Sequence, residues 1–89
     1  MTVELVELMY EQDHGKLPDQ VNLLDTAEEK VIDAETNVEK TTVFYTLYSV
    51  KGKKDHFYVT ILNKEGLIAA IPPNDLLEIY FPKYLEKKP

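Results

Sequence analysis

Cysteine and arginine are both missing from this 89-residue chain, and each absence excludes a class of chemistry. Without cysteine there is no disulfide, no thiolate nucleophile and no zinc–thiolate site. Without arginine the chain lacks the bidentate fork that most often reads guanine and clamps phosphate. Because the net charge is also −6, we expect no direct binding to nucleic acid.

Long apolar runs are missing as well. The longest, residues 67–73, is far too short to cross a membrane. The first residues carry glutamates where a secretory signal needs a basic region. The absence of cysteine suits a reducing compartment. We therefore expect a cytoplasmic protein with no membrane partner.

The chain also lacks the motifs that identify enzymes, such as a phosphate-binding loop, a dinucleotide-binding glycine pattern or a nucleophile elbow. Its only side chains that titrate near neutrality without help are His14 and His56. Asp13 and His14 are adjacent, which is not the spacing that places two metal ligands on one helix face. We predict no catalytic residue, no cofactor and no metal ligand.

What the chain does contain is enough apolar side chain for one small domain, residues 1–89. Hydrophobic residues make up 44% of the sequence, and nine residues are Tyr or Phe. A domain of this size buries only about 60–65% of the surface that its unfolded chain exposes, so a second subunit could add to its stability. The lysine-rich residues 83–89 are predicted to be a frayed tail unless Tyr84 and Leu85 anchor it.

Residues 41–62, TTVFYTLYSVKGKKDHFYVTIL, are predicted to form a β-hairpin because they are rich in β-branched and aromatic residues. A two-residue turn at Gly52–Lys53, with glycine at positive φ, would place Tyr48 opposite Phe57. A longer loop through Lys54 would shift this register. In the two-residue register, one face carries Phe44, Thr46, Tyr48, Val50, Phe57, Val59 and Ile61. The other carries Val43, Tyr45, Leu47, Ser49, His56, Tyr58, Thr60 and Leu62.

The flanking segments give an expected order of β-α-β-β-β-α. Residues 2–10 are predicted to form a strand because Val6, Leu8 and Tyr10 alternate; a short helix is the alternative, because Val3, Val6 and Tyr10 also suit one helix face. We predict a helix at 24–38 with Asp25 or Thr26 as N-cap, and a strand at 67–71 after a turn at 63–66. A short helix with Asn74 as N-cap would end before Pro82. The expected fold is α+β, an antiparallel sheet of three or four strands packed by one helix and a short C-terminal helix. If residues 30–36 form a strand instead, the domain becomes mostly β.

Two groups of side chains are the predicted interaction sites. Residues 1–40 hold eleven acidic residues against three lysines, a net charge of −8. On a helix, carboxylates four residues apart lie about 5–6 Å apart and would resemble a row of phosphates presented to a basic groove. The simpler interpretation is a solvated surface helix. This acidic row comprises Asp25, Glu28, Glu29, Asp33 and Glu35.

The second group lies on the second face of the hairpin and is too apolar for a fully solvated surface. Its cover could be the C-terminal segment 76–85, a second copy of the chain, or a partner or ligand. This second sheet face comprises Val43, Tyr45, Leu47, Tyr58 and Leu62.

From these features we predict a small acidic protein-interaction module, an inhibitor or regulator of a larger protein such as one that binds nucleic acid. Phage inhibitors often have this size and composition. One alternative is a homodimeric structural or assembly protein that self-associates through the second sheet face. Another is a small-molecule binder or enzyme that uses a tyrosine-rich face and His56.

Overall fold

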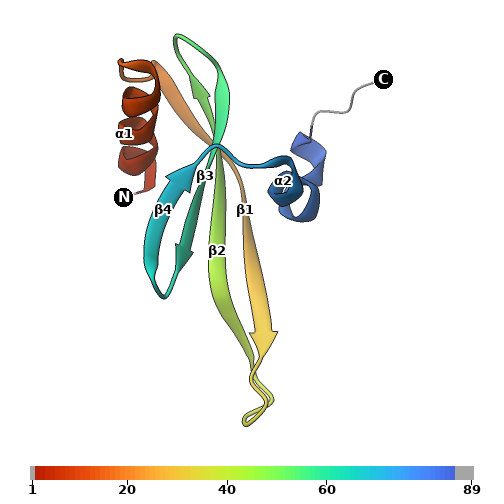
Figure 1. Ribbon diagram of the computed structural model, residues 1–89. Coiled ribbons are helices and arrows are strands. Elements are labelled where there is room, and N and C mark those ends of the chain that lie inside the picture. The colour runs from red at the N-terminus through yellow and green to blue at the C-terminus, as the bar shows by residue number, and fades with distance from the viewer. Residues whose placement is uncertain (1, 86–89) are drawn as a thin grey trace.

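A four-stranded antiparallel sheet, with its strands in chain order, forms the centre of the protein (Figure 1). The computed structural model describes residues 2–85. Its strands are β1 (Gln20–Ile32), β2 (Glu39–Lys51), β3 (His56–Asn63) and β4 (Gly66–Ala70). Its helices are α1 (Thr2–His14), α2 (Asn74–Tyr80) and the short 3-10 helix η1 (Pro82–Tyr84). The order is therefore α-β-β-β-β-α, and the α+β class predicted from the sequence is confirmed.

The N-terminal segment is a helix, so the strand predicted at residues 2–10 is wrong. Val6 and Tyr10, which are four residues apart, are fully buried against the sheet, whereas Leu8 is 47% exposed. This is the spacing of one helix face, and it prevails over the alternation that suggested a strand. Helix α1 ends at His14, and Gly15 follows with φ at 73°.

The next segment is strand β1, so the helix predicted at residues 24–38 is also wrong. The pairing of β1 with β2 shifts between Leu23 and Asp25 and again between Glu29 and Lys30, as at β-bulges. The extra residue of β1, Leu24, interrupts the two-residue alternation of this strand. Residues that face the core therefore recur three positions apart, as at Leu24 and Ala27. This spacing is also typical of one face of a helix. With no helix here, neither Asp25 nor Thr26 is an N-cap.

The central hairpin forms as predicted, but its register differs by one residue. Tyr48 lies opposite Tyr58, not Phe57, because the loop between β2 and β3 runs from residue 52 to 55. This is the longer loop through Lys54 that the sequence left open. A shift by one residue exchanges the faces of a strand, so Tyr58 now lies on the same face as Tyr48.

Both faces of the sheet are covered by the chain itself (Figure 1). Helix α1 packs on one face, and its buried residues form the α1 cluster with the sheet: Val6, Tyr10, Tyr48, Val50, Tyr58 and Ala69. Helix α2 and the turn after it pack on the other face and form the α2 cluster: Tyr45, Leu47, Val59, Leu77 and Phe81. The expected core therefore lies on both sides of one sheet.

The C-terminal third follows the sequence closely. Asn63 pairs with Gly66, whose φ is 137°, and this confirms the predicted turn between β3 and β4. Helix α2 ends before Pro82 as expected, but its N-cap is Pro73 rather than Asn74. Within the predicted tail, Tyr84 and Leu85 pack against the α2 cluster, and residues 86–89 lie outside the described residues. No helix within residues 2–85 has the length and apolar character needed to span a bilayer.

Gly52 is required by close packing rather than by its backbone conformation. A Cβ atom at this position would lie 2.7 Å from the hydroxyl oxygen of Tyr10. That hydroxyl cannot move aside freely, because it donates a hydrogen bond to the Lys54 carbonyl (2.7 Å) and accepts one from the Lys54 N–H (2.9 Å). Gly52 therefore allows α1 to bind the loop between β2 and β3.

We predict that Gly52→Ala lowers the free energy of unfolding by about 1–3 kcal/mol, because the new methyl group overlaps the Tyr10 hydroxyl. Lys53→Ala in the same loop is the control and should change stability by less than about 0.5 kcal/mol. Urea unfolding of both variants measures the difference. Equal stability of the two would show that Tyr10 does not constrain this loop.

Candidate interaction site

The acidic row predicted on a helix does not form, because its residues lie on strand β1 and in the turn that follows. Asp25 and Asp33 accept hydrogen bonds from backbone N–H groups, those of Thr26 and Glu35, each at 2.8 Å. Glu28 contacts the hydroxyl of Thr41 (3.4 Å) and the ammonium of Lys30 (3.7 Å). The hypothesis of a helical phosphate mimic is therefore wrong.

Glu29 joins three elements of the fold. Its Oε2 accepts hydrogen bonds from the hydroxyls of Tyr45 on β2 (3.3 Å) and Tyr80 on α2 (3.0 Å). The two rings stack with their centroids 4.3 Å apart. The neighbouring hydroxyl of Tyr45, followed by burial and the hydrogen bond to Glu29, raises the pKa of Tyr80. Glu29 thus ties α2 to the sheet.

We predict that Glu29→Gln lowers the free energy of unfolding by about 0.5–1.5 kcal/mol, because hydrogen bonds to a charged acceptor are stronger than those to an amide. Glu28→Gln is the matched control one residue away, and its exposed contacts should contribute little. Thermal and urea unfolding compare the two variants. A larger loss for Glu28→Gln would contradict the assigned role.

The second sheet face predicted as an interface is not one surface. Tyr45 and Leu47 are buried in the α2 cluster, and Val43 packs against it. Tyr58 and Leu62 lie on the opposite face because of the one-residue shift in register. Of the alternatives for cover, the C-terminal segment is the one that the structure shows.

Tyr58 holds the end of α1 on the sheet. Its hydroxyl donates a 2.6 Å hydrogen bond to Oδ2 of Asp13, near the C-terminal end of α1. Burial, with the hydrogen bond to Asp13 second, raises the pKa of Tyr58 above its ordinary value. Asp13 is thus a structural hydrogen-bond acceptor within α1.

We predict that the protein loses stability as the pH rises above about 10, the ordinary pKa of tyrosine. The raised pKa values of Tyr58 and Tyr80 mean that unfolded phenols lose protons before folded ones, which favours unfolding. This stabilisation is complete below pH 10 and disappears as the folded-state groups titrate. Urea unfolding between pH 8 and 11 should show a shallower decline for Tyr58→Phe than for the natural chain, and equal slopes would contradict this.

The end of the β1–β2 hairpin, residues 29–42, is an exposed feature that we call the arm. Strand β3 pairs with β2 only as far as Phe44, so beyond it the hairpin is two strands wide and projects from the body (Figure 1). All of its residues are exposed except Asp33 and Thr41, which are half-buried. Val31, Ile32 and Val38 are 48%, 69% and 57% exposed. The sequence interpretation missed this arm because it assigned a helix here.

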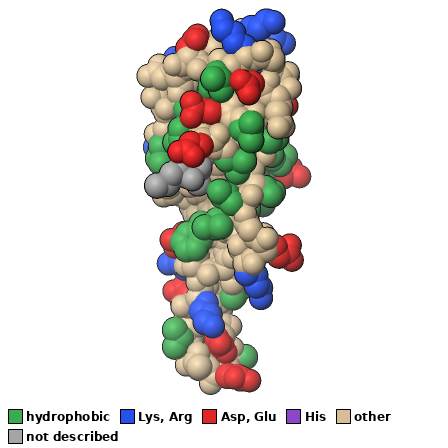
Figure 2. Space-filling view, turned by 90° about the vertical axis from the view of Figure 1, so that its left-hand side faces the viewer, with side chains coloured by type: hydrophobic (Ala, Val, Ile, Leu, Met, Phe, Trp, Pro, Cys, Tyr) green, Lys and Arg blue, Asp and Glu red, His purple; other side chains and the backbone are tan. Residues whose placement is uncertain are grey.

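The face that carries α1 continues the apolar surface beyond the helix. Leu23, Phe44 and Leu62 lie on this face and are 60%, 45% and 44% exposed. Figure 2 shows hydrophobic side chains across the middle of the molecule and the arm below them. A hollow of about 570 Å³, lined by residues that include Phe44, Glu28 and Lys30, lies at the base of the arm.

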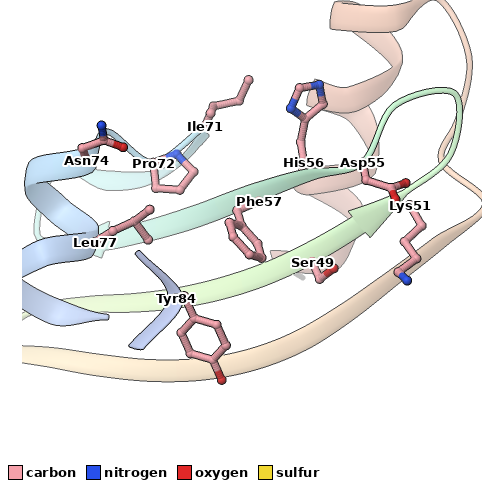
Figure 3. Close-up of a pocket in the computed structure, with 10 residues that line it drawn as sticks. All are labelled: Ser49, Lys51, Asp55, His56, Phe57, Ile71, Pro72, Asn74, Leu77 and Tyr84. Atoms are coloured by element: carbon pink, nitrogen blue, oxygen red, sulfur yellow. The ribbon is translucent and has the colours of Figure 1, made fainter. Parts of the chain in front are cut away.

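A second hollow, of about 480 Å³, lies at the other end of the sheet (Figure 3). Strand β4 ends at Ala70 opposite Val59, and Pro72 and Pro73 follow, which cannot donate to a strand ladder. The first residues of β3 therefore have no strand on that side. The lining is polar at Ser49, Lys51, Asp55, His56 and Asn74, and apolar at Phe57, Ile71, Pro72, Leu77 and Tyr84.

Among residues 2–85, no group of three or more His, Asp or Glu side chains is placed to hold a metal ion. Comparisons with known protein families, curated proteins and solved structures found no match for the chain.

Proposed function

We propose that this protein is a protein-interaction module that binds a larger protein through its arm, as an inhibitor or regulator. The observation that carries the proposal is the exposure of Val31, Ile32 and Val38 on a ribbon only two strands wide. Such a ribbon is marginally stable in water. A partner that covers these side chains would stabilise it and exclude water from them.

The chemistry of the arm indicates the kind of partner surface that would fit it. Residues 29–42 hold four acidic residues against two lysines. Their exposed apolar side chains lie between these charges, as in interfaces with an apolar centre and a polar rim. The complementary surface is an apolar groove edged by basic side chains, and its charge would also speed association. The proposal places the protein in the cytoplasm and assigns it no catalytic role.

A second copy of the chain is the alternative partner. The apolar strip of Leu23, Phe44 and Leu62 beside the base of the arm favours it, because exposed apolar strips can become dimer interfaces. A solution mass near twice 10.3 kDa would support this alternative, and a monomer at high concentration would exclude it.

A small-molecule site is the other alternative, favoured by the hollow beside His56 (Figure 3). Its volume of about 480 Å³ lies within the range of ligand pockets. It is open at the sheet edge, and its lining mixes one lysine with one aspartate, so it favours no one charge of ligand.

We predict that Ile32→Lys weakens binding of the partner at least tenfold, because it removes apolar contact and places a cation against a basic surface. Ile79→Lys on α2 is the matched control, since Ile79 is 70% exposed and Ile32 is 69% exposed. Proteins captured from the host lysate on the natural chain should be retained by Ile79→Lys and lost by Ile32→Lys.

Equal retention by the two variants, with both folded, would sink the assignment of the arm. Failure of the natural chain to retain any protein would contradict a protein partner other than a second copy.

A further inference from the structure

The two histidines of the chain meet in space although 42 positions separate them. His14 is the last residue of α1 and His56 is the first residue of β3. Their rings stack with centroids 5.0 Å apart and an angle of only 8° between the planes. On the helix side, the ring of Tyr10 lies against His14 with a centroid distance of 4.4 Å. The stack therefore forms part of the contact between α1 and the sheet.

Each ring also has a polar atom without a hydrogen-bond partner. The Nε2 atoms of His14 and His56 are buried, and neither atom forms a hydrogen bond within the described part of the chain. A neutral imidazole tolerates this as an unused acceptor, whereas a protonated ring would bury a charged donor with no acceptor.

The separation of the two rings bears on whether both can carry a proton. Two imidazolium rings with centroids 5.0 Å apart repel each other in a partly buried site. The titratable and charged groups near the stack include Tyr10 and Asp13 from α1, Lys51 at the end of β2, Lys54 and Asp55 from the loop, and Tyr58 from β3. Asp13 is already an acceptor for Tyr58.

We propose that the His14–His56 stack is a pH-sensitive clasp, which holds the end of α1 on the sheet when at most one ring is protonated and releases it when both are. Histidine is the side chain that ordinarily changes charge between pH 5 and 8. Release would separate the last turn of α1 from β3 and expose the adjoining part of the α1 cluster, including Tyr58. This inference is independent of the arm.

The sign of the effect follows from proton counting. The unfolded chain binds two protons at its histidines in mild acid, whereas the folded clasp accepts only one. Stability therefore falls as the pH is lowered. When the unfolded state binds one proton more than the folded state, the unfolding equilibrium constant changes about tenfold per pH unit. Working above pH 5 keeps the carboxylates largely ionised.

The test is urea unfolding of the full chain between pH 7.5 and 5, compared with His14→Phe and His56→Phe. Each variant keeps an aromatic ring in the stack but removes the second charge. For the natural chain, we expect the folding equilibrium constant to fall about tenfold for each pH unit of acidification near pH 5–6. For each variant, we expect a much smaller fall. Identical pH profiles for all three chains, or a gain in stability of the natural chain in acid, would overturn the proposal.

If the variants do not fold, NMR titration of the imidazoles in the natural chain gives the answer. We expect one ring to take up a proton while the spectrum stays native. The other should do so only as the amide protons of residues 11–14 lose protection from exchange. Independent protonation of both rings with protection retained would overturn the clasp.

Discussion

The central β2–β3 pair is apolar on both faces, and the chain must exclude water from both with only 89 residues. Helix α1 covers one face, and α2 with the following turn covers the other (Figure 1). Neither helix is long enough to cover the far end of the longest strands. The arm is therefore what remains of β1 and β2 beyond the covered body, and its exposure follows from the same constraint.

Tyrosine and acidic side chains hold the two covers in place. Tyr58 binds Asp13 to secure α1, and Tyr80 binds Glu29 to secure α2. The ring of each tyrosine supplies apolar contact while its hydroxyl keeps a hydrogen bond. Part of the negative charge of the chain is thus used within the fold, at Asp13 and Glu29.

The β2–β3 hairpin, β4 and α2 could be predicted as elements because local signals determine them. Gly66 supplies the positive φ that the turn between β3 and β4 needs, and Pro82 stops α2. The N-terminal third could not, because the bulge at Leu24 gives β1 the spacing of a helix. The register also escaped prediction, because Gly52 is selected by a tertiary contact with Tyr10. The helix assigned to residues 24–38 hid the arm. The wrong register grouped residues from opposite faces of the sheet into the predicted second sheet face. The fold class could therefore be predicted from the sequence, whereas the candidate site could not.

The central claim is that the arm is an interaction surface that the chain itself leaves uncovered. Hydrogen exchange of the free protein and of its complex with the captured partner tests this most directly. The account predicts that amides of residues 29–42 exchange fast in the free protein and at least tenfold more slowly in the complex, with the β2–β3 core unchanged. Slowing confined to α2 or to the hollow beside His56, with the arm unchanged, would contradict it.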